Sequence, residues 1–186
     1  MKNLSLLLIL FGFWTANAQS PEEMKAWQDA MTPGAQHKWM ANYAGEWDVE
    51  VKMWMNPSQP PMTSTGICSS EMIMGGRYMA HKFKGEFWNM PYEGQGVTAY
   101  DNTAQKYYST WYDNMSTGLM YMEGTYDEKT KTMTSTGESI DPMTKKVCQI
   151  KEITKYISDD KYVMEMFNTM DGNEIKMMEM TYTRKK

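Results

Sequence analysis

From residue 46 to the end of the chain, apolar and polar residues alternate with a period of two in short segments. In the first segment, Trp47, Val49, Val51 and Met53 alternate with acidic and basic residues. A period of two places successive side chains on opposite faces of a strand, so this pattern predicts a strand with one buried face. Clusters of Gly, Pro, Asn and Asp separate the segments, and helical periodicity is absent from this part of the sequence.

About ten strands are predicted in this way. Their approximate limits are 46–53, 62–71, 77–87, 92–100, 106–113, 119–126, 132–139, 147–156, 161–168 and 174–184. Parallel pairing requires long crossover connections between strands. The turns between these segments are too short for such connections, so the sheet must be an antiparallel meander. A meander of this length avoids exposed edges most simply by closing on itself. We therefore predict an all-β fold, a closed antiparallel barrel over residues 45–186, with a two-sheet sandwich as the alternative.

Residues 1–18 are predicted to be a cleaved secretory signal peptide. A short basic start precedes an apolar run from Leu4 to Trp14, which is too short to span a bilayer as a stable anchor. Ala16-Asn17-Ala18 then matches the small-x-small pattern of a cleavage site. We expect a periplasmic or secreted protein without an integral membrane segment after cleavage; a retained membrane anchor is the alternative.

Residues 19–44 are predicted to form short helices that precede the barrel. Ser20-Pro21-Glu22-Glu23 has the pattern of a capping box with proline at the first helical position. A second helix is expected to begin near Thr32-Pro33, to carry Trp39 and Met40, and to end before Gly45.

Composition and residue counts exclude several classes of function. A formal net charge of −4, or −5 once Lys2 is removed, provides no electrostatic basis for binding nucleic acid. His81 and His37, the latter expected on the exposed N-terminal helix, are too few for a catalytic triad or a His-rich zinc site. We assign no catalytic residue, cofactor or metal ion, although an enzyme whose site leaves no motif stays open.

Cys68 and Cys148 allow either a disulfide, which export permits, or two small buried residues.

Methionine replaces leucine as the main apolar residue. Of the 22 methionines, 21 follow the initiator, whereas Leu119 is the single leucine after the predicted signal peptide. Both side chains are unbranched at Cβ and similar in volume, but methionine is softer and more adaptable. The alternation places eight of the methionines on inward faces: Met53, Met79, Met120, Met122, Met164, Met166, Met178 and Met180.

A short helix followed by Gly45-Glu46-Trp47 at the start of the first strand resembles the lipocalin-like, or calycin, barrels. In those barrels the tryptophan closes one end and an arginine of the last strand packs on it. Arg184 occupies such a position here, and of 19 basic residues only Arg77 and Arg184 are arginine. Gly45, Trp47 and Arg184 are therefore expected to have a structural role, since a guanidinium group stacks well on an indole.

Further motifs occur in one order along nearly the whole mature chain. They include Lys52-Met53-Trp54-Met55, Gly75-Gly76-Arg77, Met90-Pro91-Tyr92-Glu93-Gly94, Glu123-Gly124-Thr125-Tyr126-Asp127 and Asp141-Pro142-Met143-Thr144. This set resembles the bacterial domain-of-unknown-function family numbered 1579. The resemblance implies a lipocalin-like barrel and assigns neither an activity nor functional residues.

One predicted strand carries polar residues on its apolar face. Over 77–87, Arg77 and His81 share that face with Met79 and Phe83, and a barrel would place polar contacts to a ligand in this way. Alternatively, Arg77 braces the barrel end and His81 is a hydrogen-bonded core residue. Together with inward methionines, these residues predict a site for a small hydrophobic ligand. The predicted site comprises Arg77, Met79, His81, Phe83, Met120, Met122, Met164 and Met166.

Two other functions are consistent with the same residues. A filled barrel would indicate a structural or interaction protein, which contacts its partner through the N-terminal helix and through Trp54 and Trp88. Thioether sulfurs together with His81 would instead suit Cu(I) in an exported protein. Trp111 and Asp113 share one face of their strand, and the pattern does not show whether this face points into or out of the barrel. Asp113 is expected to form hydrogen bonds with the turn that follows.

Overall fold

The computed structural model of the chain describes residues 20–87, 89–170 and 172–186. The predicted signal peptide and Trp88 lie outside these described residues. Helix α1 (Pro21–Met31) and helix α2 (Ala35–Ala41) precede ten strands. The strands are β1 (Gly45–Met53), β2 (Met62–Ile73), β3 (Tyr78–Phe87), β4 (Met90–Asp101), β5 (Lys106–Asp113), β6 (Met120–Asp127), β7 (Thr132–Ile140), β8 (Val147–Ser158), β9 (Lys161–Met170) and β10 (Asn173–Arg184).

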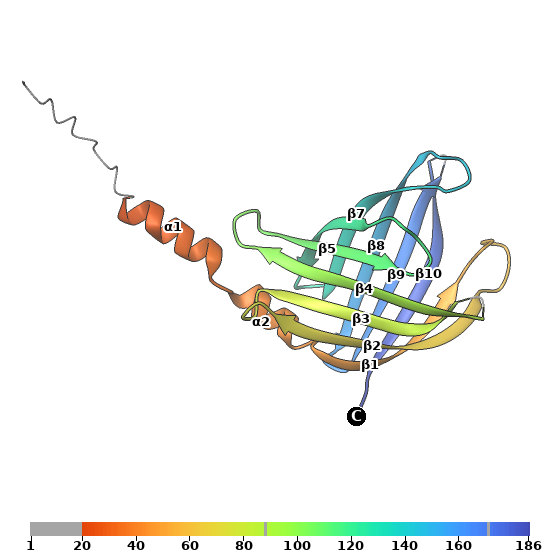
Figure 1. Ribbon diagram of the computed structural model, residues 1–186, viewed down its shortest axis with the longest axis horizontal. Coiled ribbons are helices and arrows are strands. Elements are labelled where there is room, and N and C mark those ends of the chain that lie inside the picture. Colours follow the sequence, from red (N-terminus) through yellow and green to blue (C-terminus); the bar gives the residue numbers. More distant parts are fainter. Residues whose placement is uncertain (1–19, 88, 171) are drawn as a thin grey trace, which may run out of the picture.

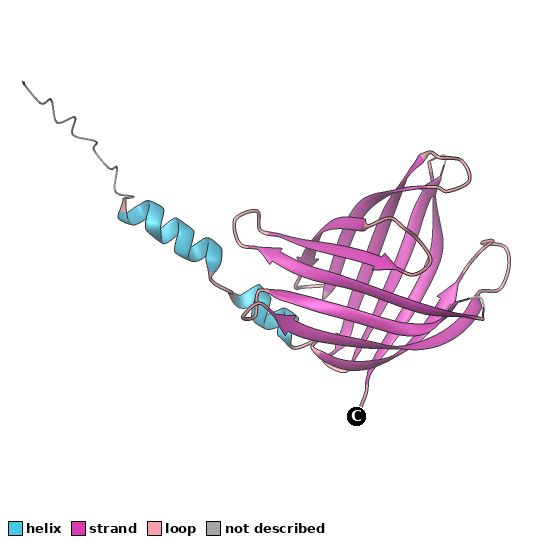
Figure 2. Cartoon of the chain, in the orientation of Figure 1, coloured by secondary structure: helices cyan, strands magenta, loops and turns pink. Residues whose placement is uncertain are grey.

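The ten strands form a closed antiparallel barrel in which each strand pairs with the next along the chain and β1 pairs with β10. The predicted all-β meander barrel is therefore confirmed, and the alternative of a two-sheet sandwich is wrong. Figure 2 shows how strands make up nearly all of the domain, with the helices at one end.

Tight turns hold the hairpins in register. The side chains of Asp101, Asp127 and Asp141 each accept hydrogen bonds from backbone N–H groups two and three residues further on. These bonds favour the charged carboxylate and lower the pKa of all three aspartates. Because an aspartate that bonds its own turn fixes the local backbone, the sequence pattern marks the strand ends well.

Glycines on the inner face make room for large rings. A Cβ at Gly94 would lie 2.3 Å from Cζ2 of Trp111, and a Cβ at Gly66 would lie 2.3 Å from Cζ of Phe83. Such separations are far below van der Waals contact, so each ring packs directly on the backbone of a neighbouring strand.

We call the end of the barrel at which α2 packs the helix end. There Met40 of α2 joins Met79, Tyr107 and Met133 in a buried cluster. The opposite end, which we call the loop end, carries residues 54–61, 114–119 and 141–146 between strands, and none of the described helices lies across it (Figure 1).

Helix α1 projects away from the barrel and none of its residues is buried (Figure 1). Its capping box is formed as predicted, with Ser20 and Glu23 bonded to each other's backbone. Its exposed apolar residues are Met24, Trp27 and Met31. Neither α1 nor α2, the helices of the described part of the chain, is long and apolar enough to cross a membrane.

Candidate functional site

The inner face of the barrel is lined mainly by methionine and aromatic side chains. Directly paired residues of neighbouring strands point to the same side of a sheet. Met53 is paired with Met178, which in turn is paired with Met166, and Val51, Met180 and Met164 form the adjacent row. The buried members of this lining include Met79, Phe83, Met122, Met164 and Met180. All eight methionines expected to point inward lie on this face.

The interior is not packed uniformly. Its buried apolar residues form two clusters, one built on Trp47, Val49 and Phe83 and the other on Met40 and Tyr107 at the helix end, and Tyr43 packs against both. Several inward side chains towards the loop end are only half-buried, so solvent reaches them: Met53, Phe87, Trp111, Met120, Met166 and Met178.

His81 lies on the inner face of β3 and has a hydrogen-bond partner at each ring nitrogen. Nδ1 is 2.9 Å from Oγ of Ser70, and Nε2 is 3.0 Å from Oγ1 of Thr98. Burial lowers the pKa of His81 to about 4, so the ring is neutral at physiological pH. With both nitrogens engaged, His81 has the geometry of a satisfied core histidine that orients two hydroxyl groups.

Arg77 does not point into the barrel, so the prediction of an inward arginine beside His81 is wrong. Its Nη2 donates to the carbonyl oxygen of Met31 at 2.8 Å, and its Nη1 donates to that of Met74 at 3.0 Å. Arg77 is exposed and precedes the first residue of β3. The strand alternation therefore does not extend to it, and its charge stabilises the carbonyl end of α1. The alternative, an arginine that braces the barrel end, describes its position better.

A half-buried carboxyl group, which the sequence reasoning missed, lies inside the barrel. Glu152 of β8 is paired with Ser135 of β7 and with Met166 of β9, and its Oε1 accepts a bond from Oγ1 of Thr154 at 3.2 Å. Burial raises its pKa, because the charged form loses its hydration. The basic residues Lys151 and Lys155 lie on the outer face of β8. Because side chains alternate along a strand, these two lysines could have shown that Glu152 points inward.

Trp111 and Asp113 lie on the inner side of β5, the choice that the sequence pattern left open. Nε1 of Trp111 donates to the Tyr92 hydroxyl at 2.9 Å, and that hydroxyl donates to Oδ2 of Asp113 at 3.0 Å. The other oxygen of Asp113 accepts from the backbone N–H of Met115 at 2.9 Å, the turn contact expected for it. These bonds hold the Trp111 ring against the barrel wall near the loop end.

Trp47, Gly45 and Arg184 meet at the helix end. The Arg184 guanidinium lies 4.3 Å from the Trp47 ring centroid, and its nitrogens donate to the carbonyl oxygens of Ala44, Asn42 and Asp159. Gly45 has φ of +128°, and a Cβ there would lie 2.9 Å from Nη1 of Arg184. A residue with a Cβ would be strained at this position and would clash with the guanidinium group. Glycine therefore allows Arg184 to lie over the indole of Trp47.

Cys68 lies beside His81, since its Sγ is 3.9 Å from Oγ of Ser70, which also bonds His81. Both cysteines are free thiols, with Cys68 buried on β2 and Cys148 half-buried on β8, so the disulfide alternative is wrong. His37 is buried, not exposed as expected, because its Nδ1 accepts from the backbone N–H of Gly34 and its ring packs edge-on against Tyr100. Across the described residues, no three His, Cys, Asp or Glu side chains are grouped so that they could hold a metal ion.

Two aromatic residues were expected to contact a partner. Trp54 is half-buried, with the Lys176 ammonium 5.1 Å from its ring centroid. Trp88 lies outside the described residues.

A family model described as "Protein of unknown function (DUF1579)" matches residues 32–184, which span α2 and all ten strands. No curated protein matches the chain.

Proposed function

The chain belongs to the DUF1579 family of proteins of unknown function, and on that premise we propose that it binds a small apolar molecule inside the barrel. The ligand enters through the loop end, since α2 occupies the other end. It is held by methionine and aromatic side chains of the inner face.

The observation that carries this proposal is a row of half-buried methionines. Met53, Met178 and Met166 are direct neighbours across β1, β10 and β9, and all three point inward while keeping contact with solvent. A folded chain normally buries such side chains against other atoms, so an accessible apolar row inside a barrel supports a binding surface. Flexible thioethers also adapt to ligands of different shape.

The loop end supports the proposed route of entry. Apolar side chains are exposed on the strand ends and loops that surround it, and their exposed fractions range from 37% for Met115 to 90% for Met143. The others there are Met55, Met62, Met90, Leu119, Ile140 and Val147. An apolar molecule that approaches this end can therefore leave water before it reaches the interior.

The interior also suggests which polar group a ligand carries. Glu152 is paired with Met166, at the end of the methionine row, and burial favours its neutral form. A neutral carboxyl group both donates and accepts hydrogen bonds. We expect the preferred ligands to combine an apolar body with a single uncharged hydrogen-bonding group.

The experiment is a titration with N-phenyl-1-naphthylamine, a neutral probe whose fluorescence rises in apolar surroundings. Met166→Gln and Met178→Gln place an amide of similar length in the lining, and each should weaken probe binding about threefold to tenfold. The matched control is Met74→Gln at the helix end, where the side chain is 71% exposed. This variant should bind the probe as the unchanged protein does.

Absence of saturable probe binding would contradict the proposal. An equal loss in Met74→Gln and Met166→Gln would do so as well, because it would place the probe on the outer surface. Circular dichroism of each variant separates loss of the site from loss of the fold.

The methionine row also supports a second candidate function, binding of Cu(I). Three thioethers on adjacent strands are soft ligands suited to this ion, although His81 is bonded to Ser70 and Thr98 and is not part of the row. Met166→Leu distinguishes the two functions, because it keeps the apolar lining and removes a sulfur. Competition with a chromogenic Cu(I) chelator should show weaker copper binding in this variant if copper is the ligand, with probe binding retained.

A further inference from the structure

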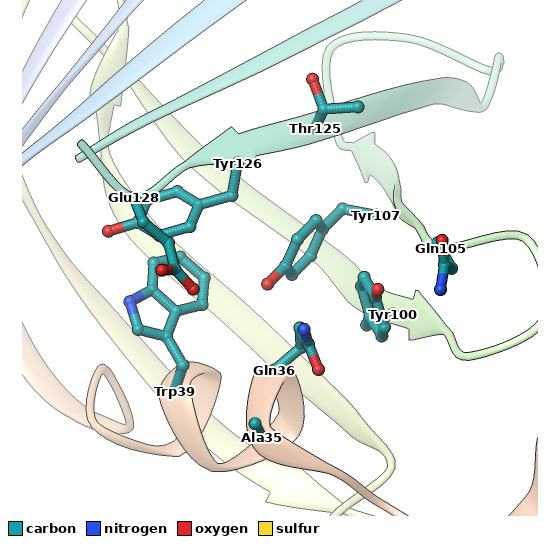
Figure 3. A pocket seen from close by; sticks show the side chains of 9 residues that line it. All are labelled: Ala35, Gln36, Trp39, Tyr100, Gln105, Tyr107, Thr125, Tyr126 and Glu128. Atoms are coloured by element: carbon teal, nitrogen blue, oxygen red, sulfur yellow. The ribbon is translucent and has the colours of Figure 1, made fainter. Parts of the chain in front are cut away.

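A separate cavity of about 430 Å³ opens at the helix end, between α2 and the ends of β4, β5 and β6. Four of its nine lining residues are aromatic: Trp39, Tyr100, Tyr107 and Tyr126. Figure 3 shows these rings with Glu128, which lies on the same side as Trp39 and Tyr126. The volume is within the range of about 300–1,000 Å³ typical of small-molecule sites.

The aromatic rings of this wall are in contact with one another. The Trp39 ring centroid is 4.3 Å from that of Tyr126 and 5.8 Å from that of Tyr107, and Tyr107 is 4.8 Å from Tyr100. The contacts link all four rings into one surface contributed by α2 and three strands. Because each ring carries a negative π face, such a surface attracts a cation that is only weakly hydrated.

The charge of the cavity is also negative. Glu128 is the one charged residue among the nine that line it, and it is exposed at the turn after β6. Burial raises the pKa of Tyr107 and of Tyr126, and the Glu128 carboxylate adds to the rise for both. Tyr107 and Tyr126 therefore stay neutral, and Glu128 supplies the charge that a ligand meets.

We propose that this cavity, which we call the aromatic cage, binds a small organic cation of the quaternary ammonium class. The rings contact the methyl groups of the cation, and Glu128 compensates its charge. Primary ammonium groups are strongly hydrated and gain less from ring faces, so they are poorer ligands. The aromatic cage lies at the end of the barrel opposite the loop end and shares no residue with the methionine row.

The test compares choline with 3,3-dimethylbutan-1-ol, its neutral analogue in which carbon replaces nitrogen. Isothermal titration of the full chain should show saturable binding of choline, and the neutral analogue should bind at least about tenfold more weakly. Equal binding of the two molecules, or no binding of choline, would overturn the proposal.

Two variants locate the binding within the aromatic cage. Glu128→Gln should weaken choline binding about threefold to fivefold, because the carboxylate is exposed, and should leave the neutral analogue unaffected. The matched control is Glu50→Gln. Glu50 is an exposed carboxylate on the outer face of β1, so this variant should bind choline normally.

Tyr126→Phe keeps the ring and should retain choline binding, whereas Tyr126→Leu should lose most of it. Choline affinity that is the same in Glu128→Gln and Tyr126→Leu as in the unchanged protein would overturn the proposal.

Discussion

At the residue scale, two titratable groups inside the barrel respond to pH in opposite ways. Both are half-buried inside the barrel, and this burial lowers the pKa of the His81 imidazole and raises that of the Glu152 carboxyl. In each case the neutral form is favoured in the folded state. Both groups therefore contribute to the pH dependence of the stability of the barrel.

His81 is expected to destabilise the fold in mildly acidic solution. Its pKa is about 4 in the folded protein and 6.5 otherwise, so between these values the unfolded chain binds a proton that the folded chain does not. The contribution of His81 to the free energy of unfolding should thus fall as the pH decreases from about 6.5 to about 4, by on the order of 3 kcal/mol. Urea denaturation at a series of pH values measures this slope.

The matched variant is His81→Gln, whose amide can still bond Ser70 and Thr98 but does not titrate. In this variant the free energy of unfolding should depend less on pH in this range. A residual slope should come from His37, because burial lowers its pKa as well. An unchanged slope in His81→Gln would show that His81 is not the group responsible.

Glu152 is expected to cost stability at neutral and alkaline pH. Because its pKa is raised in the folded state, the stability that its neutral form provides is lost as the pH rises above about 4.5, the ordinary value. Glu152→Gln removes the charge and keeps the shape, so this variant should unfold at a higher temperature than the unchanged protein at pH 8. Thermal melts should show a much smaller difference at pH 4, and a variant less stable at pH 8 would contradict the assignment.

At the scale of elements, the two arginines have different tasks. Arg184 joins the last strand to the chain between α2 and β1, where it covers Trp47. Arg77 instead holds the end of α1, together with Asn102, whose Nδ2 donates to the carbonyl oxygens of Asp29 and Thr32. One arginine therefore stabilises the closed barrel and the other positions a helix beside it.

Comparison of Arg184→Lys with Arg77→Lys tests this difference. A lysine at 184 loses the stacked planar group and most of its directed bonds, so the free energy of unfolding should fall by about 2 kcal/mol. Arg77→Lys should change barrel stability by less than about 0.5 kcal/mol, since α1 buries none of its residues. Urea denaturation followed by tryptophan fluorescence measures both, and equal losses would contradict the distinction.

The prediction of elements from the sequence was close for the strands. The segment 106–113 has the observed limits of β5, and most other predicted limits differ from those observed by one or two residues. Tight aspartate turns and a strict period of two explain this agreement. The position of Arg77 was misjudged because the alternation of β3 was continued into a turn, where side-chain direction no longer follows parity.

At the scale of the whole molecule, the sequence predicted the closed meander but not the difference between its two ends. That α2 occupies one end depends on contacts between Met40 and residues of β3, β5 and β7, which are distant in the chain. The aromatic cage likewise combines residues of α2 with the ends of three strands. Neither leaves a local pattern, because both arise from closure of the barrel and from the packing of a short helix on it.

The inner lining, unlike the two ends of the barrel, was predictable because it depends on a local pattern. Parity assigns each strand residue to one face without any knowledge of its neighbours, so the inward methionines could be named in advance. Parity does not indicate how completely they are covered. The partial exposure of Met53, Met166 and Met178 is therefore a property of the assembled barrel, and the proposed ligand site depends on it.

Methionine-methyl NMR tests this central claim most directly. In protein labelled with ¹³C at the methionine methyl groups, titration with N-phenyl-1-naphthylamine should shift the signals of Met53, Met166, Met178 and Met120. The signals of Met24 and Met74, which are exposed on α1 and at the helix end, should stay unchanged. Shifts confined to these exposed methionines, with the inward row unaffected, would contradict a ligand site inside the barrel.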